Sequence, residues 1–337
     1  MTRMLVSKER NRFREIDARK VSLGRFQTVS PSWLKDHVVR FIAEQRPDAI
    51  LDPFAGKGLL LAAVLERIEA RGEGFDIDPE AGWPVNDSLS GIPAAPGAVI
   101  VTNPPFLARH SAKRKRVHEE LAEHYRTRYD LYQLALDRCL QACPRVVAIV
   151  PETIINSSYP MRHILSITIL EENPFEDTDC PVCVICMDAG AVPPGEGPMV
   201  FRGDEPLGPL GRFEAMRLHP RGTVDIRFND PCGRTGLRAV DLPGPDKPAM
   251  FFAREDLDYP AGRIRESSRL VTFLEIPSLG DGEIAGLVER ANRLLADYRR
   301  ETCDILLSPF KGNTADGRRR RRLDYRTARA ILEMSLP

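Results

Sequence analysis

The feature that most constrains this chain is a pair of prolines placed just after a short apolar run. Ala98-Val99-Ile100-Val101 has the composition of a buried strand, and Asn103-Pro104-Pro105-Phe106 follows after one residue. Neither proline has an N–H group for a strand ladder, so the chain must leave the sheet stiffly here. An amide and an aromatic ring are therefore held at the carboxyl edge of a sheet, where open α/β sheets bind their ligands.

A second motif lies upstream, where a short apolar strand runs into Asp52-Pro53-Phe54-Ala55-Gly56-Lys57-Gly58. Glycines at a strand-to-helix turn let the backbone approach a ligand closely. The sequence has neither the Walker spacing nor the dinucleotide glycine pattern here. An Asp before the glycines would repel a pyrophosphate but can accept hydrogen bonds from an ammonium group. The turn therefore favours a cationic ligand, while the amide and ring after the later strand suit a planar base that carries an amino group.

The two motifs together resemble those of the amino-group DNA methyltransferases, which use S-adenosylmethionine to methylate adenine N6 or cytosine N4. Phe26-Gln27-Thr28 resembles the motif that precedes the cofactor loop in the gamma class, although Val29 and Ser30 separate it from Pro31. The resemblance covers roughly residues 24–188. It implies an α/β fold with a Rossmann-like, doubly wound methyltransferase domain, and S-adenosylmethionine as the cofactor.

The resemblance also implies a role for each matching residue. The expected catalytic residues are Asn103, Pro104, Pro105 and Phe106. The expected cofactor-binding residues are Phe26, Thr28, Asp52, Phe54, Gly56, Gly58, Asp76, Ile77 and Asp87. Asn103 Oδ1 and the Pro104 carbonyl would accept the two N–H groups of the target amine, and Phe106 would stack on the base. The ten residues between Asp76 and Asp87 are few for a parallel crossover, so the helix there must be rudimentary or missing.

Apolar patterning predicts how the rest of the chain is organised. Strands are expected at 48–52, 73–77, 98–102, 145–150 and 182–187. Helices are expected at 31–45, 57–70, 117–142 and 159–166, and again at 282–301. Residues 189–275 are rich in Gly and Pro and predict loops with short strands. The chain would then consist of a basic arm at 1–20, the methyltransferase domain at 21–188, and an irregular, mixed target-recognition region at 189–337.

The formal net charge is zero, but the charges are unevenly distributed. Residues 1–20 carry +4, residues 311–329 carry +6, and residues 171–206 carry −8. Separate basic clusters suggest that a polyanion is contacted on one side. For the arginine run 318–322 alone, a plain solvated surface is an equally good interpretation. The residues expected to contact nucleic acid are Arg109, Lys113, Arg114, Lys115, Arg116, Phe175, Arg318, Arg319 and Arg320.

Composition excludes several classes of protein. No apolar run approaches the roughly 18 residues of a membrane span, and the N-terminus lacks the apolar core of a secretory signal. Seven cysteines suit a reducing cytoplasm better than a disulfide scaffold. Cys180, Cys183 and Cys186 have metal-like spacing but lie in an apolar run without a second pair, so no metal is expected. A zinc or iron–sulfur site remains the alternative.

The sequence therefore predicts a cytoplasmic, nucleoid-associated methyltransferase that flips adenine out of double-stranded DNA and methylates its N6. It would be the modification partner of a restriction endonuclease, with no membrane partner. Methylation of an RNA base, at adenine N6 or guanine N2, is one alternative, and methylation of cytosine N4 in DNA is another. A glutamine-modifying protein methyltransferase shares the Asn-Pro-Pro-Phe motif. If the chain is not an enzyme, the alternative is a catalytically inactive nucleic-acid-binding protein.

Overall fold

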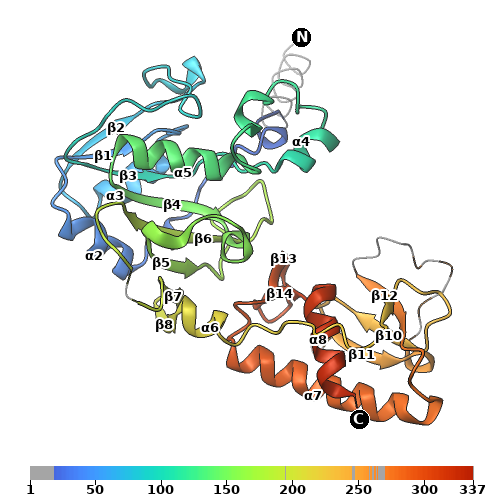
Figure 1. Cartoon of the computed structure of the whole chain (residues 1–337). Helices are drawn as coiled ribbons and strands as arrows, with labels where there is room; N and C mark the ends of the chain where they lie inside the picture. The colour runs from blue at the N-terminus through green and yellow to red at the C-terminus, as the bar shows by residue number, and fades with distance from the viewer. Residues whose placement is uncertain are drawn as a thin grey trace. The chain divides into compact units, whose positions relative to one another are not determined.

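The computed structural model describes residues 19–193, 195–244, 247–257, 259, 262, 264 and 270–336. Residues 1–18 of the expected basic arm lie outside this range. The described chain forms two compact units, which Figure 1 shows in full. The first unit contains the residues up to 154 together with 158–209, and the second contains 155–157 together with the residues from 210 onward.

The first unit is built on an eight-stranded mixed sheet with the order β2-β1-β3-β4-β6-β5-β7-β8. Its strands are β1 Ala49–Asp52, β2 Arg71–Gly74, β3 Ala98–Thr102, β4 Arg145–Pro151, β5 Ile164–Ile169, β6 Val182–Asp188, β7 Met199–Arg202 and β8 Glu205–Pro209. The first four strands run parallel, and β6 is antiparallel to both β4 and β5. Strands β1 and β3 are buried along their whole length, as the continuous apolar runs predicted.

Helices accompany this sheet in the first unit. They are α2 Asp36–Glu44, α3 Leu59–Leu65, α4 Arg109–Arg114 and α5 Leu131–Ala142. Helix α3 packs on β1 and β2, and α5 packs on β4, beside the large sheet in Figure 1. Short 3-10 helices occupy Pro31–Trp33, Pro79–Ala81, Glu123–Tyr125, Glu152–Asn156 and Met161–His163. The expected α/β fold is confirmed, with the parallel strands β2, β1, β3 and β4 forming one half of the sheet and the antiparallel pairs lying in the other half.

Two of the expected helices are wrong in part. The helix expected at 159–166 is a single 3-10 turn that leads into β5, because Ile164, Ile167 and Ile169 are β-branched and buried in the sheet. The helix expected at 117–142 begins only at Leu131. Before it, the chain turns repeatedly so that Leu121 and Tyr125 can reach an apolar cluster with Leu107 and Leu23.

The second unit combines a small antiparallel sheet, a hairpin and two longer helices. The sheet has the order β11-β10-β12-β9, and β13 pairs with β14. The elements of the second unit are α6 Leu210–Glu214, β9 Arg227–Phe228, β10 Thr235–Arg238, β11 Met250–Ala253, β12 Val271–Glu275, α7 Ile284–Glu301, β13 Ser308–Asn313, β14 Arg319–Arg322 and α8 Tyr325–Ser335, with 3-10 turns at Arg254–Asp256 and Asp281–Glu283. The short strands expected before residue 275 and the helix expected at 282–301 are confirmed. No helix in the described part of the chain is long and apolar enough to cross a membrane.

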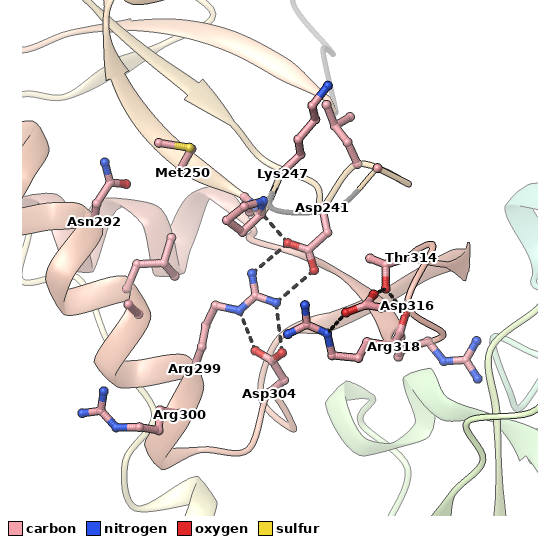
Figure 2. A pocket seen from close by; sticks show the side chains of 17 residues that line it. Asp241, Lys247, Met250, Asn292, Arg299, Arg300, Asp304, Thr314, Asp316 and Arg318 are labelled. Atoms are coloured by element: carbon pink, nitrogen blue, oxygen red, sulfur yellow. Dashed lines mark hydrogen bonds and ion pairs between the residues drawn. The ribbon is translucent and has the colours of Figure 1, made fainter.

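A double ion pair centred on Arg299 of α7 ties this unit together (Figure 2). The Arg299 guanidinium donates to both carboxylate oxygens of Asp241, at 2.7 and 2.9 Å, and to both of Asp304, at 2.8 and 2.9 Å. Asp241 is 4% exposed and also accepts the backbone N–H groups of Ala249 and Arg321. One carboxylate therefore links α7, the segment after β10 and the β13–β14 hairpin.

The surroundings of Asp241 set its protonation. Burial alone would raise the pKa of this carboxyl group, but the hydrogen bonds and charge of Arg299 and the two backbone N–H groups hold the pKa below its ordinary value. A cavity of about 500 Å³ lies beside the network and is lined by Lys247, Met250, Asn292 and Arg300 among others. The Asn292 side chain accepts the Phe251 N–H group and donates to the Phe251 carbonyl, so its polar atoms are bonded to the edge strand β11.

In the first unit, Gly24 docks the N-terminal segment against the Asn-Pro-Pro-Phe loop. The Phe106 N–H group donates to the Gly24 carbonyl at 3.0 Å. Gly24 has φ +76°, and a Cβ atom there would lie 2.5 Å from the Phe106 carbonyl oxygen. Only glycine fits this approach without moving one of the two segments.

We predict that Gly24→Ala opens this contact. Gly203 has φ +57°, but a Cβ atom there would meet no atom within 4 Å, so Gly203→Ala carries the same kind of backbone strain without the clash. Hydrogen exchange at the Phe106 amide should accelerate about 5- to 150-fold in Gly24→Ala, since overpacking costs about 1–3 kcal/mol. Equal protection of this amide in both variants would contradict the assigned contact.

We also predict that Arg299→Met destabilises the second unit by about 3–5 kcal/mol, because it leaves buried carboxylates without their partner. Arg300→Met is the matched control, since Arg300 pairs with Asp297 on the exposed side of α7 and its loss should cost less than about 1 kcal/mol. Denaturant unfolding at pH 7 measures both. Because the folded state lowers the pKa of Asp241, the wild-type advantage should be full above about pH 4 and fade as the pH falls through the depressed pKa. Equal losses in the two variants would refute the role of the network.

Candidate functional site

The carboxyl ends of β1, β2 and β3 meet at one edge of the large sheet because these strands are parallel neighbours. Asp52 ends β1, Asp76 follows β2 by two residues, and Asn103 follows β3 directly. A cavity of about 490 Å³ opens at this edge. Its lining includes Phe26, Thr28, Asp52, Phe54, Gly56, Asp76, Ile77, Asp87, Asn103, Pro105 and Leu131. The structure therefore brings together most of the residues that the sequence predicted for cofactor binding.

Asp52 is the most buried acid of the site, at 1% exposure. Its Oδ1 accepts the Phe54 N–H group at 3.0 Å and the Thr102 hydroxyl at 2.7 Å. Burial raises the pKa of this carboxyl group to about 7, against the lowering effect of the two hydrogen bonds. Asp52 can therefore change its charge near neutral pH, and a cation bound beside it would favour the ionised form.

The glycine turn after β1 is shaped by positive φ angles at Gly56 and Gly58, of +51° and +74°. A Cβ atom at Gly56 would meet no atom within 4 Å, so the backbone there faces open space. Gly58 does not line the cavity; its Cα faces the ring of Trp83, which a Cβ would approach to 3.0 Å. The Trp83 indole N–H donates to the Gly56 carbonyl at 3.0 Å and braces the turn from behind.

Asp76 closes the turn from the neighbouring strand. One carboxylate oxygen accepts the Gly56 N–H group at 2.8 Å, and the other accepts the Asp78 N–H group at 2.8 Å. Ile77 lines the cavity and is 44% exposed, so an apolar surface is available for a ligand ring. The Asp76 carboxylate thus holds the glycine turn, and its remaining lone pairs are the ones available to a ligand.

Asp87 reaches the same cavity although its crossover is short. The segment from β2 contains only the 3-10 turn Pro79–Ala81, and Asp76 forms a single parallel bridge with Val85. The Asp87 carboxylate accepts the Leu89 N–H group at 3.2 Å and the Ser90 hydroxyl at 2.5 Å. The rudimentary crossover expected from the sequence is confirmed, with Trp83 filling space behind the glycine turn.

Asn103 is held by the N-terminal segment. Its Nδ2 donates to the Phe26 carbonyl at 2.7 Å, which fixes the orientation of the carboxamide. In the part of the chain that the structure describes, Asn103 Oδ1 is a buried acceptor without a hydrogen-bond partner, and so is the Thr28 hydroxyl. Both residues line the cavity. Buried acceptors of this kind are costly unless something pairs with them.

Three aromatic rings pack beside Asn103. The ring centroids of Phe26 and Phe106 lie 4.9 Å apart, and Phe175 lies 5.9 Å from Phe106 and 6.2 Å from Phe26. An isolated antiparallel bridge between Thr28 and Phe175 brings these distant segments together. Phe106 and Phe175 are buried against each other and do not line the cavity, whereas Phe26 does.

The residues expected to contact nucleic acid fall into two groups. Arg109, Lys113, Arg114, Lys115 and Arg116 are exposed, and most of them lie on helix α4 rather than on a loop. Arg318 is exposed and pairs with Asp316 at 2.6 Å. Arg320 donates to the Asp241 and Lys311 carbonyls and covers the Phe310 ring, while Arg319 bonds Asn313. Arg318, Arg319 and Arg320 are therefore already bonded to groups of the second unit.

Sequence reasoning did not single out Trp83 or Thr102. Trp83 lies between Gly82 and Pro84 in the shortened crossover, and a large ring in such a segment was the available signal. Cys183 and Cys186 lie three positions apart on β6 and so face opposite sides of the sheet. No cluster of His, Cys, Asp or Glu among the described residues could hold a metal ion.

No family model matches the chain, and no curated protein matches it. A candidate class I S-adenosylmethionine-dependent methyltransferase from Listeria monocytogenes is similar in structure, with 18% identity and a TM-score of 0.38 over 51% of this chain and 65% of that one. The modification subunit of a candidate type I restriction enzyme from Vibrio vulnificus YJ016 has 17% identity and a TM-score of 0.36, over 64% and 57%. The type I restriction-modification methyltransferase subunit from Streptococcus thermophilus has 16% identity and a TM-score of 0.36, over 49% and 45%. The chain spans less than two thirds of each of these proteins. At such low identities and TM-scores these similarities assign no function to the chain.

Proposed function

We propose that the chain transfers a methyl group from S-adenosylmethionine to the exocyclic amino group of a nucleic-acid base, with adenine N6 in DNA as the target. The observation that carries this proposal is the state of Asn103. Its Nδ2 is occupied by the Phe26 carbonyl, and its buried Oδ1 has no partner in the described chain. A fixed acceptor without a partner, on a residue that lines a cavity, is suited to an incoming N–H donor.

The residues around the cavity suit the proposed cofactor. Its volume of about 490 Å³ lies within the usual range for small-molecule sites. Asp52 and the open backbone at Gly56 would hold the cationic methionine half, Asp76 would accept the ribose hydroxyls, and Asp87 would accept the adenine amino group. Phe26, Thr28, Phe54 and Ile77 would cover the remainder. When bound, S-adenosylmethionine supplies a methyl group activated by a sulfonium.

The chain's own contribution would be to prepare the target amine. The amine nitrogen of adenine is a poor nucleophile because its lone pair is delocalised into the ring. Asn103 Oδ1 and the Pro104 carbonyl would each accept one of its N–H groups, which draws the nitrogen toward tetrahedral geometry and localises the lone pair. A neutral amide does this without adding charge to the site. Positioning and local electrostatics would then supply most of the rate enhancement.

The target base must leave its helix to reach Asn103, because its amino group is otherwise paired and stacked. Phe106 and Phe175 would have to part for a base to stack between them, since both rings are buried against each other. The second unit would recognise the target sequence, and a restriction endonuclease would be the functional partner. RNA bases and cytosine N4 share the same chemistry and are the competing targets.

We predict that Asn103→Ala lowers the rate of methyl transfer by at least about 100-fold, the usual cost of removing one such polar group. Affinity for S-adenosylmethionine should stay within about threefold of wild type, since Asn103 would contact the target amine and not the cofactor. Single-turnover transfer of labelled methyl to DNA and to RNA, together with calorimetric cofactor binding, measures the two effects. Asn156→Ala, at an exposed asparagine outside the cavity, should transfer at the wild-type rate. Unchanged turnover in Asn103→Ala would refute the proposal.

A second prediction concerns the pH dependence of cofactor binding. Because burial raises the pKa of Asp52 to about 7, the carboxylate is mostly protonated at pH 6 and mostly ionised at pH 7.5. Affinity for S-adenosylmethionine should therefore rise about five- to sixfold over this interval, since partial loss of the proton on the ligand's amino group offsets part of the gain.

Asp52→Asn should bind the cofactor about 10- to 150-fold more weakly at pH 7.5, because a hydrogen bond to a charged group is worth about 1.5–3 kcal/mol. Its affinity should also vary little with pH. Asp48→Asn, at an exposed acid outside the cavity, should keep the wild-type profile. A flat profile in the wild-type protein would show that Asp52 does not face the cation.

A further inference from the structure

An exposed aromatic pair lies next to the catalytic loop, outside the cavity already described. Tyr129 is 57% exposed. It is the aromatic residue among the large hydrophobic side chains that are exposed in the described chain. Its ring stacks on the exposed imidazole of His110, with centroids 5.7 Å apart and an interplanar angle of 25°. His110 Nδ1 and the Tyr129 hydroxyl share a hydrogen bond of 2.6 Å. The pair is thus a preformed flat surface that faces solvent.

The aromatic pair is fixed to the Asn-Pro-Pro-Phe loop by backbone contacts. The Arg109 N–H group donates to the Tyr129 carbonyl at 2.9 Å, and Ala108 bridges Asp130. Arg109 begins α4 only three residues after Phe106. The aromatic pair is therefore held beside the segment that directly follows the Asn-Pro-Pro-Phe loop.

Charges around the pair favour a polyanion. Arg109, Lys113, Arg114, Lys115 and Arg116 are all exposed, and residues 107–118 contain no acid. Arg114 lies four positions after His110, on the same face of α4. The next acids in the chain are Glu119, Glu120 and Glu123. Glu120 lies 3.8 Å from Arg19, and Glu123 pairs with Arg126 at 2.5 Å. The patch is therefore cationic with a central aromatic surface.

We propose that the His110–Tyr129 pair is a stacking platform for an unpaired base of the nucleic-acid substrate, flanked by the phosphate-binding cations of α4. Unpaired bases bind proteins by stacking on exposed aromatic rings within a basic groove, because every base has a π face. The platform would hold a base next to the one that is methylated, in a strand already opened for base flipping. This inference deepens the proposed function and rests on it for the identity of the substrate strand.

The test compares fluorescence anisotropy binding of short labelled DNA and RNA single strands, and of the matching duplexes, by the full-length protein. Tyr129→Ala should weaken single-strand binding about 5- to 150-fold, the range for loss of one base–aromatic stack. Its salt dependence between about 50 and 200 mM should match that of wild type, because no cation is removed. Tyr129→Phe, which keeps the ring and loses only the bond to His110, should bind within about threefold of wild type.

Arg114→Gln separates charge from stacking. It should reduce the salt slope on single strands by about 0.7 and weaken binding to every sequence alike. A strand carrying 2-aminopurine should be quenched on binding by the wild-type protein and by Tyr129→Phe, but not by Tyr129→Ala. This optical signal remains informative for the wild-type protein even if Tyr129→Ala fails to fold.

Wild-type affinity in Tyr129→Ala, or an unquenched 2-aminopurine strand on the wild-type protein, would overturn the platform. Methyl transfer is measured separately on the same preparations. If wild type methylates a nucleic acid and Tyr129→Ala binds normally, the platform fails and the proposed function stands. If wild type methylates nothing yet Tyr129→Ala loses single-strand binding, the proposed function fails and the platform stands. Stronger effects on DNA than on RNA, or the reverse, identify the strand that the platform accepts.

Discussion

A hydrogen bond between neighbouring strands sets the geometry on which the candidate site depends. Thr102 at the end of β3 donates its hydroxyl to Asp52 at the end of β1, at 2.7 Å. Burying a carboxyl group costs several kcal/mol unless donors satisfy it, and the Phe54 N–H group supplies a second one. The residue after Thr102 is Asn103, so the bond that stabilises the acid also fixes the start of the Asn-Pro-Pro-Phe loop. This hydrogen bond therefore holds the Asp52 turn and the Asn-Pro-Pro-Phe loop in a fixed position relative to each other.

The N-terminal segment completes the loop from the other side. Gly24 allows a backbone approach to Phe106 that a side chain would prevent, and the next turn brings the Phe26 carbonyl onto Asn103 Nδ2. The carboxamide is thereby oriented before any ligand arrives. Pre-organisation of this kind reduces the cost of positioning groups during the reaction. The stiffness of Pro104 and Pro105 serves the same end, since the chain cannot relax back into the sheet.

Much of the first unit could be predicted from the sequence because its central strands are continuous apolar runs, such as Ala98–Thr102, that only a sheet buried on both faces accommodates. Prediction was wrong at 159–166, where β-branched residues complete the sheet in place of the expected helix. The arginine run 318–322 shows a different limit. Strand alternation and a buried Asp241 draw Arg320 and Arg321 into the unit, and a charge count along the sequence cannot show this. The bracing by Trp83 was not predicted either, because the short crossover alone does not show that the indole ring bonds the Gly56 carbonyl.

Base identification in the reaction products tests the central claim most directly. Wild-type protein is incubated with labelled S-adenosylmethionine and either duplex DNA or RNA, and the digested nucleosides are analysed by mass spectrometry. The account predicts that the label appears on the exocyclic amino group of a base, as N6-methyladenine from DNA. Label on a ring carbon, on a ribose hydroxyl or on protein alone would contradict it, because none of these acceptors uses the carboxamide geometry at Asn103.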